Sequence, residues 1–239
     1  MMNKGVSWWL LILAALFSVA LVVSNLIAGK LWAAPFGIVL PAAVWLFPIV
    51  YLIGDVVPEV YGLSVARRVI WLGFGLNAFA ILFFFICLQL PSAGFWTGQS
   101  SFEFVLGFAP RLLIASFVAY LVGTNVNAWV LVAVKRWTKS RWLWTRTISS
   151  TICGEAVDSA LFISIAFLGV IPSSQLRTMI LWQATFKIAY EILATPLTYW
   201  VVGQLKKREG LVDTGEGLTV PRESPNETPV LAIGEQARA

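Results

Sequence analysis

Histidine is absent from this chain of 239 residues, and cysteine occurs only twice. Without histidine, the chain cannot build a Ser/His hydrolase site, a His-ligated zinc protease site or a haem site with a histidine ligand. It also has no P-loop or other glycine-rich phosphate cradle, so ATP hydrolysis by this chain is not expected. Cys87 and Cys153 fall in apolar runs, where we expect buried free thiols. We therefore expect no catalytic residue, no cofactor and no metal site.

Charged residues are also scarce, at 12% of the chain, whereas 59% of the residues are hydrophobic and the mean hydropathy is +0.81. Several apolar runs reach the roughly 20 residues that a membrane-spanning helix needs. The sequence predicts an all-α integral membrane protein, a single bundle of six transmembrane helices in residues 1–208. The expected spans are Trp8 to Ala28, Ile38 to Asp55, Val69 to Leu90, Leu112 to Val134, Ile148 to Val170 and Met179 to Gln204. Residues 209–239 are rich in Gly, Pro, Glu and Thr, and we expect a disordered cytoplasmic tail there.

Lysine and arginine are unevenly divided between the two sides of these six spans. One side would carry Lys4, Arg67, Arg68, Lys135, Arg136, Lys139, Arg141, Arg146, Lys206, Lys207 and Arg208, and the other only Lys30, Arg111 and Arg177. The positive-inside rule then places both termini in the cytoplasm. Because basic loops that face anionic lipid explain the net charge of +5, we expect a lipid bilayer and no nucleic acid as partner.

The last two predicted spans carry ionisable residues in their interior. Glu155 and Asp158 are three residues apart on one face of the fifth span, and Gln183, Lys187 and Glu191 follow each other at intervals of four in the sixth. One charge at the bilayer centre costs roughly 2.5 to 3.5 kcal/mol, so a compensating environment is required. We predict a wet cavity that binds a polar ligand. The alternative is a purely structural ion pair between the two helices.

The second predicted span contains Pro41, Pro48 and Pro58, which would free backbone carbonyls and break the helix near its inner end. Where the backbone stays helical, one stripe of this span would hold Phe47, Tyr51, Asp55 and Glu59. Irregular backbone at membrane depth is tolerated where it lines a cavity, which favours a binding site. Alternatively, Asp55 and Glu59 only cap a turn at the inner face.

Asparagine also occurs inside the spans. Asn25, Asn77 and Asn127 are further candidates for substrate binding, although interhelical hydrogen bonding explains them equally well. The complete set of predicted substrate-binding residues is Glu155, Asp158, Lys187, Glu191, Asp55, Glu59, Tyr51, Phe47, Asn25, Gln183, Asn77 and Asn127.

Motifs in every span resemble the queuosine precursor transporter family, which is also described as vitamin uptake transporter-like. They are SNLIAGK (24–30), FPIVYLIGDVVPEVYG (47–62) followed by Ala66-Arg67, GFGLN (73–77), RLLIASFVAYLVGTNVN (111–127), GEAVDSALFISIAFLG (154–169) and FKIAYEILATPLT (186–198). The resemblance implies a bacterial inner-membrane protein related in fold to the substrate-binding subunits of energy-coupling-factor transporters. It also implies uptake of 7-cyano-7-deazaguanine or 7-aminomethyl-7-deazaguanine.

A guanine-like base suits the polar residues of the spans, because a carboxylate accepts two hydrogen bonds from its N–H and amino edge. Three alternatives stay open: a substrate-capture subunit that needs a separate energising module, an ion- or proton-coupled pathway for another small polar solute, and an intramembrane enzyme. A homo-oligomer is compatible with the sequence.

Overall fold

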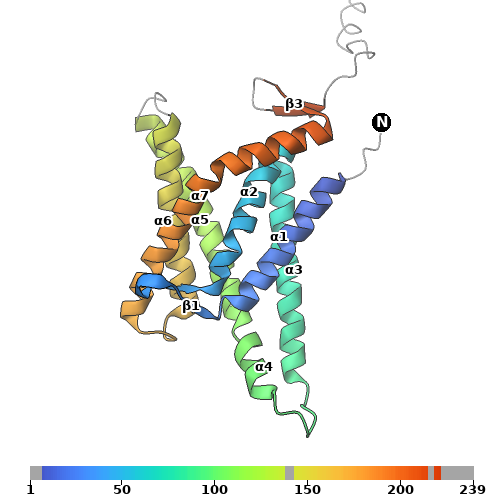
Figure 1. Ribbon diagram of the computed structural model, residues 1–239, viewed down its shortest axis with the longest axis vertical. Coiled ribbons are helices and arrows are strands. Elements are labelled where there is room, and N and C mark those ends of the chain that lie inside the picture. Colours follow the sequence, from blue (N-terminus) through green and yellow to red (C-terminus); the bar gives the residue numbers. More distant parts are fainter. Residues whose placement is uncertain (1–6, 138–142, 215–217, 222–239) are drawn as a thin grey trace, which may run out of the picture.

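The computed structural model describes residues 7–137, 143–214 and 218–221. Its helices are α1 (Trp8–Ile27), α2 (Phe47–Tyr61), α3 (Leu63–Gln89), α4 (Gln99–Leu106), α5 (Ala109–Trp137), α6 (Leu143–Phe167) and α7 (Ser173–Glu209). All except the short α4 run between the two ends of the molecule (Figure 1). The start of α1 and the end of α7 lie at one end, and β1 and α4 lie at the other, which we call the outer end (Figure 1).

Four helical segments of the described residues are long and apolar enough to cross a membrane. They are Trp8–Ile27, Leu63–Gln89, Gln99–Val134 and Ile148–Phe167. The predicted all-α membrane protein is thus confirmed in its broad class. Helix α7 contains the sixth predicted span, but its charged and polar residues keep it outside this group. Helix α2 is outside the group because it has only 15 residues.

The second predicted span is wrong in its boundaries. Instead of a helix over 38–55, residues 31–41 form an antiparallel hairpin of β1 (Leu31–Ala33) and β2 (Val39–Pro41), and a short 3-10 turn (Ala42–Trp45) leads into α2. The hairpin turn includes a second 3-10 turn (Pro35–Gly37), in which Phe36 and Gly37 have positive φ angles. The helix therefore begins only at Phe47, although the residues before it are strongly hydrophobic.

Proline shapes α2 less than the sequence suggested. Pro41 ends a strand and Pro48 occupies the first turn of α2, where no hydrogen bond is lost, so only Pro58 lies inside the helix. The chain reverses one residue after α2, at Gly62, whose φ of 84° and ψ of 162° are accessible in practice only to glycine. The predicted break at the prolines is therefore wrong: α2 continues through Pro58 to Tyr61, and Gly62 separates it from α3.

The start of α1 and the ends of α2 and α7 are tied together by side chains. Tyr61, the last residue of α2, donates a hydrogen bond of 3.0 Å to Oε1 of Glu209 at the end of α7. Ser7, which caps the start of α1, donates to the same carboxylate. The guanidinium of Arg208 lies 4.8 Å from the ring centre of Trp9. These contacts hold three helix ends in a fixed relation at the end opposite to α4.

Residues 211–214 and 218–221 differ from the expected unstructured tail. They form a second antiparallel hairpin, β3 (Leu211–Thr214) with β4 (Leu218–Pro221). Leu211 packs against a core of α1, α2 and α7 residues, which gives the hairpin an apolar anchor. The rest of the predicted tail, residues 222–239, lies outside the described residues.

Helices α5 and α6 form the most extensive helix pair of the structure. Gly123 and Gly154 face each other in this pair: a Cβ added at Gly123 would lie 2.9 Å from Cβ of Asp158, and one at Gly154 would lie 2.9 Å from Cβ of Asn127. Only residues without a side chain allow such an approach of two helices. The predicted buried thiols, in contrast, are wrong for Cys87, which is exposed on α3, and Cys153 is only half-buried.

Candidate functional site

A cavity of about 110 Å³ lies where α2, α5, α6 and α7 meet. Figure 1 shows α5, α6 and α7 side by side at this level of the bundle. The cavity is lined by Tyr51 of α2, by Tyr120, Gly123, Thr124 and Asn127 of α5, by Thr151, Gly154, Glu155 and Asp158 of α6, and by Glu191 of α7. Three carboxylates therefore converge on one small space inside an apolar bundle.

Lys187 of α7 provides the positive charge next to this cavity. Its Nζ lies 3.3 Å from Oε2 of Glu155 and also forms an ion pair with Asp158, and its side chain is only 4% exposed. The amine further lies 5.0 Å and 5.6 Å from the ring centres of Phe47 and Tyr51, a distance at which an aromatic face attracts a cation. Tyr51 donates a hydrogen bond of 3.1 Å to Oε2 of Glu155. The predicted ion pair between the last two long helices is thus present.

Glu191 is outside this ion pair although it lines the same cavity. Its Oε1 accepts a hydrogen bond of 3.3 Å from Thr151, and no ion pair involves it among the described residues. Asp55 of α2 is exposed but close enough to interact electrostatically with Glu191 and Glu155. The single ammonium group of Lys187 therefore faces more than one carboxylate. Glu191 has no lysine partner among the described residues and is left to bind a ligand.

Asn127 contributes an unpaired polar atom to the cavity. Its Oδ1 is buried and has no hydrogen-bond partner within the described structure. A buried carbonyl oxygen without a partner costs about 1–3 kcal/mol. Asn127 and Asp158 contact the glycines of the α5–α6 pair, so the close approach of these helices fixes where both polar groups face the cavity. A ligand N–H at this position would satisfy the amide.

Five of the twelve predicted site residues line the cavity: Tyr51, Asn127, Glu155, Asp158 and Glu191. Lys187 and Phe47 lie next to this lining, and the other five predicted residues lie elsewhere. Asp55 and Glu59 are exposed on α2, and Asn25 and Asn77 are buried on α1 and α3. Gln183 is fully buried on α7, one turn before Lys187, and neither polar atom of its amide has a partner within the described structure. Asn77 does not form the hydrogen bond between helices that was the alternative for the asparagines, because neither polar atom of its amide has a partner in the described structure.

The sequence interpretation missed the contribution of α5. Tyr120, Gly123 and Thr124 line the cavity together with Asn127, at the i, i+3, i+4, i+7 spacing of one helix face. That spacing is visible in the sequence and could have identified this face. Gly154 was missed as well, because a glycine carries no chemical group that marks a site. Among the described residues, no cluster of three or more Asp, Glu, Cys or His side chains could hold a metal ion.

A sequence model of the family described as "Putative vitamin uptake transporter" matches residues 41–201, which include every residue that lines the cavity. The chain is 26% identical over 165 residues to a "Probable queuosine precursor transporter" of Bacillus subtilis (strain 168), covering 69% of this chain and 72% of that protein. It is 31% identical over 121 residues to the "Queuosine precursor transporter" of Escherichia coli (strain K12), covering 51% of this chain and 52% of that protein. No solved structure matches the chain.

Proposed function

Because the chain belongs to the queuosine precursor transporter family, we propose that it takes up 7-deazaguanine precursors and binds the base in the cavity between α2, α5, α6 and α7. As a family member it is a transporter rather than an enzyme, and a multi-pass protein of the bacterial inner membrane. The observation that carries the proposed binding mode is the convergence of Glu155, Asp158 and Glu191 on one cavity with a single buried lysine.

The proposed substrates are 7-cyano-7-deazaguanine and 7-aminomethyl-7-deazaguanine. Their guanine-like edge presents a ring N–H and an amino group, which one carboxylate accepts as a pair of charge-assisted hydrogen bonds. We assign this role to Glu155, which already accepts a hydrogen bond from Tyr51. Lys187 and the amide of Asn127 or Gln183 would bind the base carbonyl and ring nitrogens. Phe47 and Tyr51 offer faces for stacking, worth about 1–3 kcal/mol per base.

Glu191 supports the aminomethyl compound in particular. This carboxylate lies in the cavity without a lysine partner in the described structure, so it can pair with the primary ammonium group of that substrate. The same surplus carboxylate would serve a proton- or ion-coupled pathway. Conduction of protons in the absence of any base would favour that second reading.

The cavity of about 110 Å³ is smaller than the roughly 300–1,000 Å³ of typical small-molecule sites. A base therefore enters this site only when the helices or the ion pair rearrange. In our proposal the substrate replaces Lys187 as the partner of Glu155, while Lys187 keeps its ion pair with Asp158. Substrate binding and opening of the ion pair are then one event.

We further propose that α1, α2, α3, α5, α6 and α7 each cross the membrane and that both termini are cytoplasmic. Support comes from the distribution of Lys and Arg and from the ends of α1 and α7, which lie at the same end of the molecule (Figure 1). A reporter that is active only in the periplasm, fused after Gly210, should be inactive. Strong activity of that fusion would contradict the orientation.

Uptake in bacteria that can neither make nor import the precursors tests the function. Expression of this chain with external 7-cyano-7-deazaguanine should restore the queuosine modification in tRNA, and an empty vector should not. Restoration that depends on co-expression of an energising module would favour the substrate-capture alternative. Reconstitution of the purified chain in liposomes distinguishes the two cases, because only a self-sufficient transporter accumulates substrate there.

Competition during uptake tests the binding mode. Adenine lacks the N–H and amino edge and would leave the carboxylate unpaired, so it should compete hardly at all. Guanine keeps this edge but has a ring nitrogen in place of the substituted carbon, and it should compete weakly. Equal competition by adenine and guanine would contradict the role of Glu155, and no competition by unlabelled 7-cyano-7-deazaguanine would contradict the substrate.

A further inference from the structure

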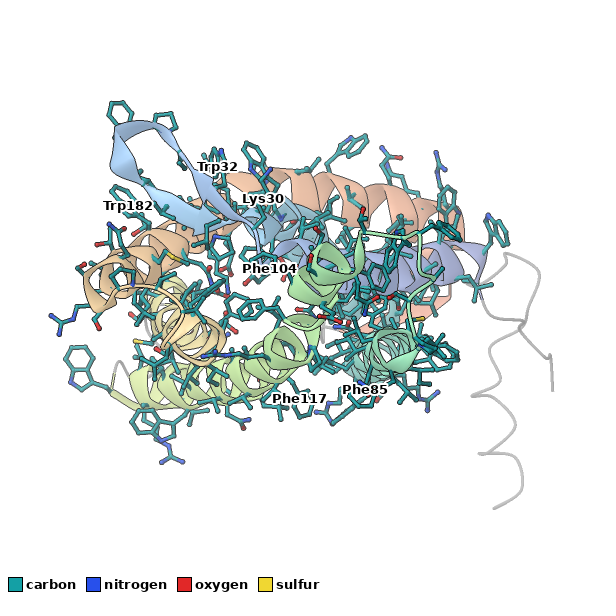
Figure 2. All side chains as sticks on the ribbon, turned by 90° about the horizontal axis from the view of Figure 1, so that it is seen from below. Lys30, Trp32, Phe85, Phe104, Phe117 and Trp182 are labelled. Atoms are coloured by element: carbon teal, nitrogen blue, oxygen red, sulfur yellow. The ribbon has the colours of Figure 1, made fainter. Side chains whose placement is uncertain are left out.

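A second and larger cavity, of about 450 Å³, lies at the outer end of the molecule. We call it the outer pocket. Its lining residues come from three segments: Leu26, Gly29, Lys30 and Leu31 from the end of α1 and the residues after it, Glu103, Phe104, Val105, Gly107 and Phe108 from α4 and the turn before α5, and Phe167 and Val170 from the last residue of α6 and the loop after it. Viewed from this end, Lys30 and Phe104 lie near the middle of the molecule, whereas Phe85 and Phe117 lie towards its edge (Figure 2).

The outer pocket combines aromatic faces with one charge of each sign. Phe104, Phe108 and Phe167 line it, and the rings of Phe108 and Phe167 are 5.9 Å apart. Lys30 has no ion-pair partner within the described part of the chain, and Glu103 accepts a hydrogen bond of 2.6 Å from Gln99. Lys30 and Glu103 are both exposed, so they can donate and accept hydrogen bonds at the mouth of the pocket, and an acyl chain has no polar group that would use them. A planar ring with hydrogen-bonding groups at its edge fits both parts of the lining.

The outer pocket lies at one end of the α5–α6 pair that lines the charged cavity: Gly107 and Phe108 directly precede α5, and Phe167 is the last residue of α6. Along α6, Asp158 lines the cavity and Phe167 lines the pocket, about 13 Å further at 1.5 Å per residue. Between these levels lies a closely packed apolar cluster, which we call the apolar plug: Leu112, Ala115 and Ala119 of α5, and Phe162, Ile163 and Ala166 of α6. Each of these six residues is at most 6% exposed. The two cavities are therefore successive spaces on one seam, separated by a closed layer.

The difference in volume gives the order in which a ligand meets the two cavities. The charged cavity is too small for a base while it is closed, whereas the outer pocket lies within the range of about 300–1,000 Å³ typical of small-molecule sites. We propose that the outer pocket is an entry site that binds the planar base by stacking, with Lys30 and Glu103 at its polar edge, before the apolar plug opens towards the charged cavity. This inference rests on the proposed function.

Equilibrium binding of radiolabelled 7-cyano-7-deazaguanine to the purified full chain in nanodiscs tests the entry site. Glu155→Gln together with Glu191→Gln removes two carboxylates of the charged cavity and keeps the Lys187–Asp158 ion pair. This variant should still bind the base, with affinity about tenfold weaker than the wild type. Adding Val105→Trp, which places a large ring in the outer pocket, should abolish the remaining binding.

Phe102→Trp is the matched control, because Phe102 belongs to the same short helix but does not line the outer pocket. Added to the same background, it should leave the remaining binding intact, and both tryptophan variants should unfold at the same temperature as their parent. The inference is overturned if the carboxylate variant binds nothing while the wild type binds and transports. It is also overturned if Val105→Trp changes nothing or if oleate displaces the base completely. A wild type without uptake overturns the proposed function and the entry site with it.

Discussion

The charged cavity lies within the helix bundle and the outer pocket lies at the end of its α5–α6 pair, and the two are built in opposite ways. The cavity is small and holds Glu155, Asp158 and Glu191 near a lysine that is only 4% exposed. The pocket is about four times as large, mostly apolar, and its charged residues Lys30 and Glu103 are exposed. A buried charge is strongly coupled to its partners, whereas an exposed one is largely screened by solvent. Identical substitutions in the two places should therefore have different consequences.

The largest difference is expected between the two lysines. Lys187→Met leaves Glu155 and Asp158 without their buried partner, which should destabilise the protein by about 3–5 kcal/mol. Lys30→Met should change stability by less than about 0.5 kcal/mol, because this side chain is exposed. Thermal unfolding of the two purified variants measures the contrast. Adding Glu155→Gln and Asp158→Asn to Lys187→Met should restore stability but not uptake. If uptake is restored as well, the ion pair has a structural role only.

Single carboxylate variants of the charged cavity come next. Glu155→Gln and Glu191→Gln should each lower kcat/KM for uptake about 10- to 100-fold, because a hydrogen bond to a charged group contributes about 1.5–3 kcal/mol. Membrane levels should stay near those of the wild type. Cys153→Ala, on the same helix but outside the cavity lining, is the control and should transport normally. Loss of protein instead of loss of transport would favour a structural role for these carboxylates.

The glycines of the two regions allow a comparison of packing. Gly154→Ala places a Cβ 2.9 Å from Cβ of Asn127 and 3.2 Å from the carbonyl oxygen of Gly123, so α5 and α6 must separate at a cost of about 1–3 kcal/mol. Gly29→Ala meets only Cδ1 of Phe108, at 3.3 Å, and that ring can shift. We expect lower thermal stability and weaker substrate binding for Gly154→Ala alone. Equal effects of both substitutions would contradict the close α5–α6 contact as the element that positions the site.

A smaller effect than that of Lys187→Met, and of opposite sign, is expected at Gln183. Replacing its fully buried, unpaired amide by leucine should stabilise the protein by about 1 kcal/mol, and Asn77→Leu on α3 should do the same. Only Gln183→Leu should lower uptake, about tenfold, because this amide lies one turn from Lys187. Thermal unfolding and uptake are measured on both variants. If both variants transport equally well, Gln183 does not contact the substrate.

Much of the site followed from the sequence because buried charge is expensive in a membrane. Glu155, Asp158, Lys187 and Glu191 had to meet partners or a polar space, and helical spacing placed them on facing stripes. The predicted helices after residue 62 also agree with α3, α5, α6 and α7 within a few residues. The position of these helices follows from the length of each hydrophobic run and from its 3.6-residue repeat. Both are local properties of the sequence, so packing against other helices did not shift them.

Other features depend on contacts between distant segments. The hairpin of residues 31–41 and the 3-10 turn of Ala42–Trp45 occupy the first part of a predicted helix, and the positive φ angles of Phe36 and Gly37 that form the hairpin turn are not indicated by hydrophobicity. The α5 face of the cavity depends on the close contact of Gly123 and Gly154 between two helices, and the outer pocket arises only where the end of α1, the α4 segment and the end of α6 meet. The sequence by itself determined that this is a membrane protein and which buried ionisable residues require a partner, since both follow from the free-energy cost of polar groups in lipid. Tertiary structure alone decided the volume and separation of the two cavities, because empty space is set by how side chains from different helices pack.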